Sequence, residues 1–298
     1  MDLRAMLMGL AFALMWSSAF TSARMIVADA PPLAALSLRF LISGLIGVAV
    51  AALMGQDWRI GRSQWRAVVI FGLCQNALYL GLNFVAMQWV EASLAAIIAS
   101  TMPLLVALLG WLFLGQKVRP LGIAGLVAGF AGAAIIMGSR LSGGVGLLGV
   151  ALCGIGALAL AIATLTVRGA AARGNVLMVV GLQMFVGAAI LAVASAASEH
   201  WQVNWTARLG LAFAYTTIVP GLLATWIWFR LVERIGAVRA ATFHFLNPFF
   251  GVAVAAVLLG ERIAVSDMIG VTVIALGILA VQLSRQPAQP VAAPAGEA

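Results

Sequence analysis

Two apolar stretches, 145 residues apart, repeat one another without a gap and place the strongest constraint on the fold. They read ASLAAIIASTMPLLVALLGWLFLGQK from residue 92 and AVRAATFHFLNPFFGVAVAAVLLGER from residue 237. Each is long enough to cross a bilayer as a helix, which takes about 20 residues. Each also has a proline near its middle, Pro103 and Pro248. Because proline removes a backbone hydrogen bond, we expect both helices to be broken there.

The repeat predicts that the chain consists of two halves of five spans each. The same register continues in Gly125/Gly270 and Gly132/Gly277. We therefore expect a first repeat over residues 1–140, a second over 145–285, and a disordered Pro/Ala-rich tail over 286–298. Since five is odd, the second repeat should enter the membrane inverted. Interrupted helices at matching positions of inverted repeats indicate the binding site of a secondary transporter.

Composition sets the fold class. Hydrophobic residues make up 64% of the chain and charged residues 9%, against about 25% charged in soluble domains. A chain of this kind is an all-α integral membrane protein, because a helix satisfies its own backbone in lipid. We place ten transmembrane helices at 4–26, 33–54, 66–88, 92–114, 119–138, 146–168, 175–197, 208–230, 237–259 and 265–284.

The net charge of +8 is explained by membrane topology and not by nucleic-acid binding. With the N-terminus inside, twelve Lys and Arg residues flank the cytoplasmic ends of the spans and four flank the outer ends. Cytoplasmic segments carry such an excess of basic residues. We therefore expect both termini to lie in the cytoplasm. We expect the lipid bilayer as a partner, and no nucleic acid.

Eight polar or amphipathic side chains at membrane depth are candidates for a water-filled central cavity. Three of them, Asn76, Tyr79 and Asn83, share one face of the third span. The full set is Trp16, Asn76, Tyr79, Asn83, Gln183, Trp228, His244 and Asn247. Alternatives stay open: the amides could bond neighbouring helices, Trp228 could belong to an interfacial belt, and His244 could be a buried structural histidine.

The nine acidic residues all lie in loops, in tails or at span ends. Carboxylates at membrane depth are the usual proton carriers of pumps, and the sequence has none there. Paired catalytic carboxylates are missing at that depth as well. The sequence thus speaks against an enzyme, against proton antiport through Asp or Glu, and against a metal site or a cofactor. His244 is the titratable group left at depth, so two options remain: facilitated export, or proton antiport through His244.

Two further features bear on the ligand and the assembly. Arg39 lies near the outer end of the second span, where we expect a structural role, with its side chain reaching the interface or a backbone carbonyl. With no Arg or Lys at the centre, phosphorylated substrates are disfavoured.

The glycines of the fifth span could mark a dimer face or pack within the bundle. We expect the latter, and a monomer.

Several motifs resemble the drug/metabolite transporter superfamily, in its EamA-type ten-helix branch. They are Leu14-Met15-Trp16-Ser17-Ser18, Leu38-Arg39-Phe40, and the pair Pro103…Leu114-Gly115-Gln116 and Pro248…Leu259-Gly260-Glu261. The resemblance covers residues 5 to about 284, and its one departure is Gln116, where the family usually has Glu.

Within that branch the chain is most similar to the aromatic amino acid exporters of the YddG type. The resemblance implies a bacterial inner-membrane protein that exports amino acids, aromatic ones included, by alternating access. Alternatives are efflux of lipophilic cationic drugs or toxic metabolites, for which central carboxylates would be expected, and a membrane scaffold or sensor without transport activity.

Overall fold

The computed structural model describes residues 3–142, 144, 146–166 and 175–284. Within these residues the regular structure is helical, with no strand, and ten helices are long and apolar enough to cross a membrane. The predicted all-α, ten-span membrane fold is therefore confirmed. The tail 286–298, which we predicted to be disordered, lies outside the described residues.

Eight of the ten spans begin and end within three residues of the predicted bounds. The elements are α1 (Leu3–Asp29), α2 (Pro32–Leu53), α3 (Arg62–Phe71), η1 (Gly72–Leu80), α4 (Gly81–Ala86), α5 (Ala92–Ser100), α6 (Met102–Leu114), α7 (Pro120–Ser142), α8 (Leu147–Thr166), α9 (Val176–Ser198), α10 (Ala207–Ile218), η2 (Val219–Leu223), α11 (Ala224–Ile235), α12 (Ala237–Thr242), η3 (Phe243–Leu246), α13 (Asn247–Leu259) and α14 (Val265–Ser284). The third span begins at Arg62 and the eighth runs on to Ile235. The first extension, residues 62–65, is mostly polar, and the second, residues 231–235, carries Glu233 and Arg234 between apolar residues.

The fourth and ninth spans are broken, as their prolines predict. The fourth is interrupted at Thr101 between α5 and α6, and the ninth by the 3-10 turn η3 between α12 and α13. Pro103 and Pro248 lie in the first turn of α6 and of α13, where a missing N–H costs least. Each second piece then ends on a left-handed glycine, Gly115 at φ +60° and Gly260 at φ +69°.

Two π-helical segments, which the sequence analysis did not predict, widen the third and eighth spans. They are η1 and η2. Shifted by the repeat offset, η1 falls on residues 217–225, the region of η2. Such widened turns occur frequently at functional sites.

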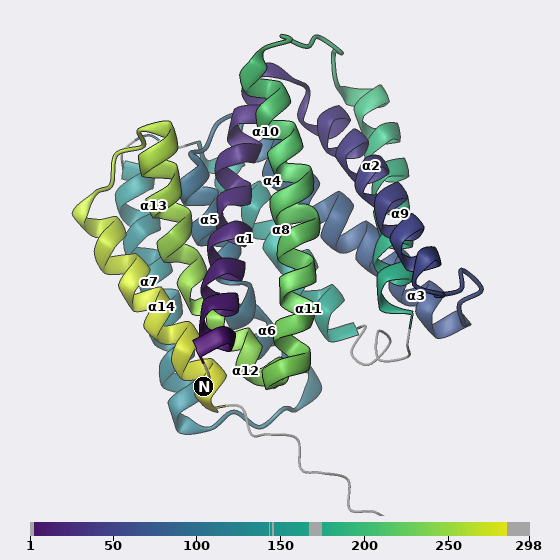
Figure 1. The fold of residues 1–298 in the computed structure, drawn as a ribbon. Coiled ribbons are helices and arrows are strands. Elements are labelled where there is room, and N and C mark those ends of the chain that lie inside the picture. The colour runs from purple at the N-terminus through teal and green to yellow at the C-terminus, as the bar shows by residue number, and fades with distance from the viewer. Residues whose placement is uncertain (1–2, 143, 145, 167–174, 285–298) are drawn as a thin grey trace, which may run out of the picture.

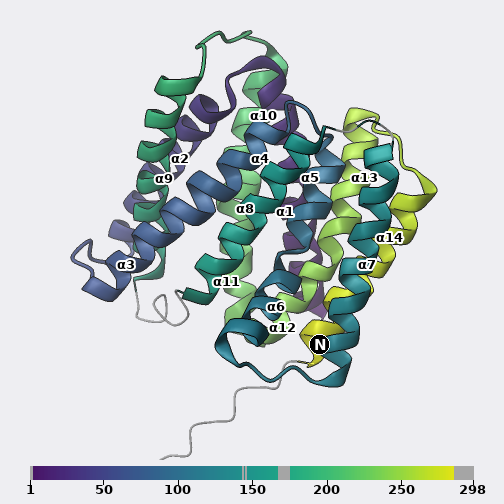
Figure 2. The ribbon, with the colours of Figure 1, turned by 180° about the vertical axis from the view of Figure 1, so that it is seen from behind.

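Two pairs of helices, each with one member from either half, lie side by side in Figures 1 and 2: α7 with α14, and α2 with α9. Glycines make the first pair close. A Cβ on Gly125 would lie 2.7 Å from the Gly277 carbonyl oxygen, and one on Gly132 would lie 2.8 Å from that of Gly270. These glycines therefore pack helices within the chain, as we expected.

Helix ends are also joined between the halves. The Glu199 carboxylate, which follows α9, accepts hydrogen bonds from the Leu33 and Ala34 amides at the start of α2 (2.8 and 3.0 Å). Gln56, which follows α2, in turn accepts one from the Met178 amide at the start of α9 (3.0 Å). The start of α2 is thus capped by a residue that follows α9, and the start of α9 by a residue that follows α2.

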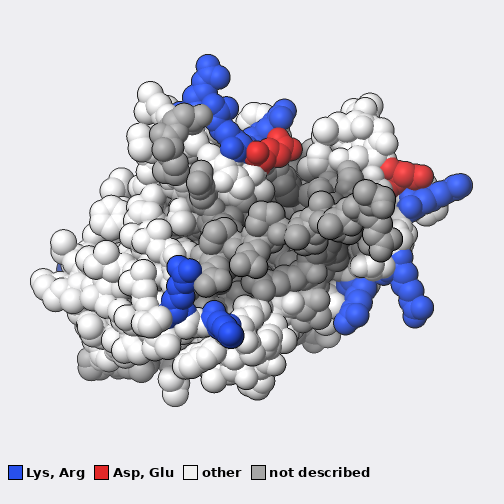
Figure 3. Space-filling model, turned by 90° about the horizontal axis from the view of Figure 1, so that it is seen from below, with Lys and Arg blue, Asp and Glu red and all other residues white. Residues whose placement is uncertain are grey.

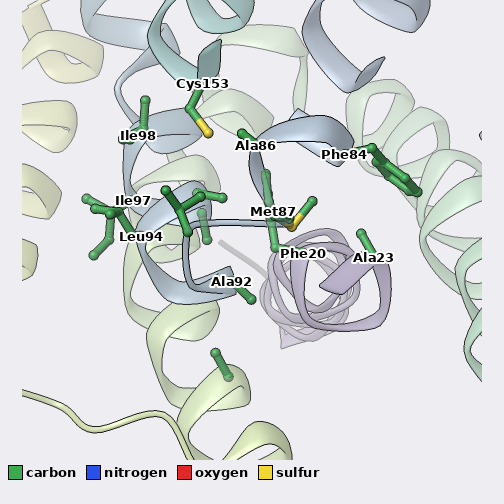
Figure 4. Packing of buried hydrophobic residues seen from close by; sticks show 14 of the residues in the cluster. Phe20, Ala23, Phe84, Ala86, Met87, Ala92, Leu94, Ile97, Ile98 and Cys153 are labelled. Carbon is green, nitrogen blue, oxygen red and sulfur yellow. The ribbon is translucent and has the colours of Figure 1, made fainter. Parts of the chain in front are cut away.

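The largest apolar core cluster runs through much of the bundle, with many of its residues toward the end away from the N-terminus. Figure 4 shows part of it, with Phe20, Phe84, Met87 and Leu94 contributed by α1, α4, the residue after α4, and α5. At the opposite end, the face on which α1 begins carries many Lys and Arg side chains and few Asp or Glu (Figure 3). We call this end the N-terminal face.

Candidate functional site

A cavity of about 390 Å³ lies inside the bundle. Ligand pockets have volumes of about 300–1,000 Å³, so the space suits a small molecule. Its described lining is mainly apolar and aromatic: Phe12, Trp16, Ala19, Phe20, Ala23, Arg39, Phe40, Ala67, Phe71, Gln75, Asn76, Tyr79, Leu80, Asn83, Phe84, Met87, Met102, Leu160, Thr164, Val176, Val179, Val180, Gln183, Met184, Pro220, Gly221, Thr225, Trp228 and His244.

The cavity brings together seven of the eight side chains that the sequence singled out: Trp16, Asn76, Tyr79, Asn83, Gln183, Trp228 and His244. Asn247 is not among the described lining residues. It lies behind His244, and its Nδ2 donates a hydrogen bond to His244 Nδ1 (2.9 Å). Of the two helix breaks, Met102 and His244 reach the cavity, whereas Pro103 and Pro248 do not belong to its described wall.

The polar amides of the wall are held by backbone carbonyls. Asn76 Nδ2 donates to the Gln183 carbonyl oxygen at 3.0 Å, and Asn83 Nδ2 donates to that of Tyr79 at 2.7 Å. The two roles that the sequence left open therefore coexist, because these amides fix neighbouring backbone and also face the cavity. Asn83 Oδ1 is buried and has no hydrogen-bond partner in the described part of the chain.

Four rings form an aromatic cluster in the cavity wall: Phe12, Trp16, Trp228 and His244. The Phe12 ring centroid lies 4.8 Å from that of Trp228 and 5.3 Å from that of His244, the latter edge to face. Trp228 therefore lines the cavity. Phe12 was missed by the sequence analysis, since an apolar ring in an apolar span carries no distinguishing signal.

Arg39 corrects one expectation. Its side chain does not reach the interface; the residue is 7% exposed and lines the cavity. It has no carbonyl partner among the described residues, and its Nε is unpaired. The cause is the rotation of α2, which packs closely on α9: a Cβ on Gly47 would lie 3.4 Å from the Gly181 Cα atom. Ser43, one turn further along α2, is the sequence signal for a polar face there.

The two π segments also contribute to the wall. Gln75, Asn76 and Tyr79 belong to η1, and Pro220 and Gly221 to η2. The described lining contains no Asp or Glu, and Arg39 is its one Lys or Arg. Among the described residues, no group of His, Cys, Asp and Glu side chains could hold a metal ion. The arrangement suits a small molecule with an apolar body and few polar groups.

A model of the EamA-like transporter family matches residues 3–138 and, a second time, residues 147–283. The uncharacterized inner membrane transporter YedA of Escherichia coli strain K12 is 30% identical, over 97% of this chain and 95% of its own. The uncharacterized transporter YvbV of Bacillus subtilis is 26% identical, over 94% and 92%. A crystal structure that is 23% identical has the same fold, with a TM-score of 0.69 over 95% of this chain and 98% of the other.

Proposed function

The chain belongs to the EamA-like transporter family, and we propose that it is a secondary transporter for small neutral metabolites, foremost amino acids, the aromatic ones included. It would export them from the cytoplasm by alternating access. The observation that carries this proposal is the cavity of about 390 Å³, which combines aromatic walls with a few buried polar groups. Helices broken or widened at the depth of the cavity provide the points at which its walls could move.

A zwitterion has no net charge, yet both of its charged groups need partners. Asn83 Oδ1, buried and unpaired among the described residues, is available to accept a hydrogen bond from an ammonium group. The Trp16 ring lines the same cavity and could stack on an aromatic side chain. Both features favour amino acids over purely apolar molecules.

Efflux of lipophilic cations is the less favoured alternative. Recognition of a cation calls for a carboxylate, and the described lining has none. Arg39 would in addition repel a positively charged molecule in so apolar a site. The electrostatics of the wall therefore support an amphoteric substrate.

We place the protein in the bacterial inner membrane, with both termini in the cytoplasm. The N-terminal face carries the basic residues (Figure 3), which is typical of a cytoplasmic side. The relative YedA is named as an inner membrane transporter. We further propose that the chain works as a monomer, because the glycines of α7 pack against α14 of the same chain.

The test is counterflow in proteoliposomes. Purified protein should exchange labelled phenylalanine and threonine at rates well above those of empty liposomes. Asn83→Leu should lower these rates, whereas Asn204→Leu, at an exposed loop position, should leave them unchanged. Failure to move any amino acid, combined with uptake of tetraphenylphosphonium, would replace the proposal by cation efflux.

A further inference from the structure

Arg39 is a buried cation without a counter-charge in the described part of the protein. None of its nitrogens has a hydrogen-bond or ion-pair partner there, and the described cavity wall contains no Asp or Glu. The aromatic ring of Phe40, with its centroid 5.4 Å from the guanidinium carbon, offers only a weak cation–π contact. Charged side chains inside a membrane are costly and normally paired. An anion from outside the chain would supply the missing partner.

The guanidinium borders the cavity, which provides room for such a group. Gly221 of η2 lies beside it without a side chain: a Cβ there would lie 3.1 Å from the Thr216 carbonyl oxygen, 3.4 Å from Arg39 Nη2 and 3.8 Å from Ser43 Oγ. The Ser43 hydroxyl is buried and also unpaired among the described residues. Two unsatisfied donors, one turn apart on α2, therefore converge on the corner between α2 and η2.

The charge and the shape of this corner select the class of anion. We propose that Arg39 binds the carboxylate group of the transported molecule, with the Ser43 hydroxyl as an additional donor. The planar guanidinium fork matches a carboxylate in a bidentate manner. A phosphate monoester carries about two charges and would call for a second cation, whereas Arg39 is the one Lys or Arg of the described lining.

This proposal rests on the proposed function and makes it more specific. Arg39 takes the carboxylate, and Asn83 Oδ1 is the acceptor left for the ammonium group. By the helix rise of about 1.5 Å per residue, Arg39 lies roughly 10 Å below the start of α2 and Asn83 roughly 5 Å below the end of α4, both in the half away from the N-terminal face. An α-amino acid offers both groups on one carbon atom.

The experiment compares ligands with and without a carboxylate. Thermal stabilisation and counterflow are measured with phenylalanine, phenethylamine, 3-phenylpropionate and benzoate, on wild type, Arg39→Gln and Arg39→Lys. Wild type should prefer phenylalanine to phenethylamine. In Arg39→Gln the ratio of the two affinities should fall by at least about tenfold, as expected when one partner of a buried charge pair is removed. Arg39→Lys, which keeps the charge but not the fork, should fall between them.

Two further variants exclude trivial explanations. Arg208→Gln removes the same charge at an exposed position of α10 and should behave as wild type. Gly221→Ala keeps Arg39 but crowds its guanidinium. It should weaken the binding of phenylalanine and leave the binding of phenethylamine unchanged. This variant tests the same corner if Arg39→Gln does not fold.

The outcomes separate the two proposals. Unchanged preference for phenylalanine in Arg39→Gln, or in Gly221→Ala where Arg39→Gln does not fold, would overturn the role of Arg39 and leave amino acid transport intact. A second outcome is that 3-phenylpropionate or benzoate stabilises wild type but not the Arg39 variant, while no amino acid is transported. It would support carboxylate binding by Arg39 and overturn amino acids as the substrate. No response of wild type to any carboxylate would overturn both.

Discussion

The guanidinium of Arg140 donates hydrogen bonds to both carboxylate oxygens of Asp267, with Nε 3.2 Å from Oδ1 and Nη2 2.8 Å from Oδ2. Asp267 is fully buried, and Arg140 forms a second ion pair with Glu91. The same carboxylate accepts a hydrogen bond from the Ala264 amide at the start of α14 (2.9 Å). This network ties the end of α7 to the start of α14, at the end of the bundle away from the N-terminal face.

Asp267→Ala should therefore lower the stability of the protein considerably. Removing one partner of a buried pair costs about 3–5 kcal/mol, because the other charge is left unpaired. The exposed pair Arg230–Glu233 is the control, since Glu233→Ala should cost no more than about 1 kcal/mol. Thermal unfolding in detergent measures both, and equal shifts would show that the network adds nothing to stability.

Gly277→Ala should disturb the contact between α7 and α14. The added Cβ would lie 2.6 Å from the Gly125 carbonyl oxygen, so the helices must separate. Overpacking of this kind costs about 1–3 kcal/mol. Gly138→Ala, at an exposed position of α7 with no atom within 4 Å of a Cβ, should be neutral or stabilising. An unfolding temperature unchanged by Gly277→Ala would contradict the packing described.

Trp16→Ala should weaken transport of phenylalanine more than that of threonine. An aromatic pair contributes about 0.5–1.5 kcal/mol beyond burial, which corresponds to roughly a two- to twelvefold rise in KM for phenylalanine alone. Trp111→Ala, at a 40% exposed position of α6, is the matched control. Equal effects of Trp16→Ala on both substrates would exclude stacking on that ring.

His244→Ala should leave the response of transport to a pH gradient unchanged. The His244 ring is held in the protein by a hydrogen bond between its Nδ1 and Asn247 Nδ2 (2.9 Å). In the described lining no carboxylate is present to pass a proton on. Uptake into proteoliposomes with an imposed gradient measures this, with Asn247→Ala as the second variant. Loss of gradient-driven uptake in His244→Ala, with downhill exchange preserved, would make His244 the proton carrier.

The ten spans and the two helix breaks follow from the sequence because lipid leaves the backbone few choices. Length and apolarity specify each span, and Pro103 and Pro248 specify the breaks. The grouping of Asn76, Tyr79 and Asn83 around one cavity was likewise predictable, since a polar side chain in an apolar span turns inward.

The position of Arg39 and the π segments were not predictable in this way. The direction in which Arg39 points depends on the rotation of α2, which is set by its glycine contacts with α9, more than 130 residues further along the chain. The extra residue of a π turn has no composition of its own; Pro220 disrupts hydrogen bonding in η2, but η1 contains no proline. Both features are products of tertiary packing.

The reciprocal caps of α2 and α9 impose an order on biosynthesis. The amide of Leu33 finds its acceptor 166 residues later, in Glu199. At about 5–20 residues per second, a ribosome needs roughly 10–30 s to cover that distance. During this interval α2 is already made while its first turn still lacks the acceptor that holds it in the finished protein. The first half therefore cannot complete its fold before the second has been synthesised as far as Glu199.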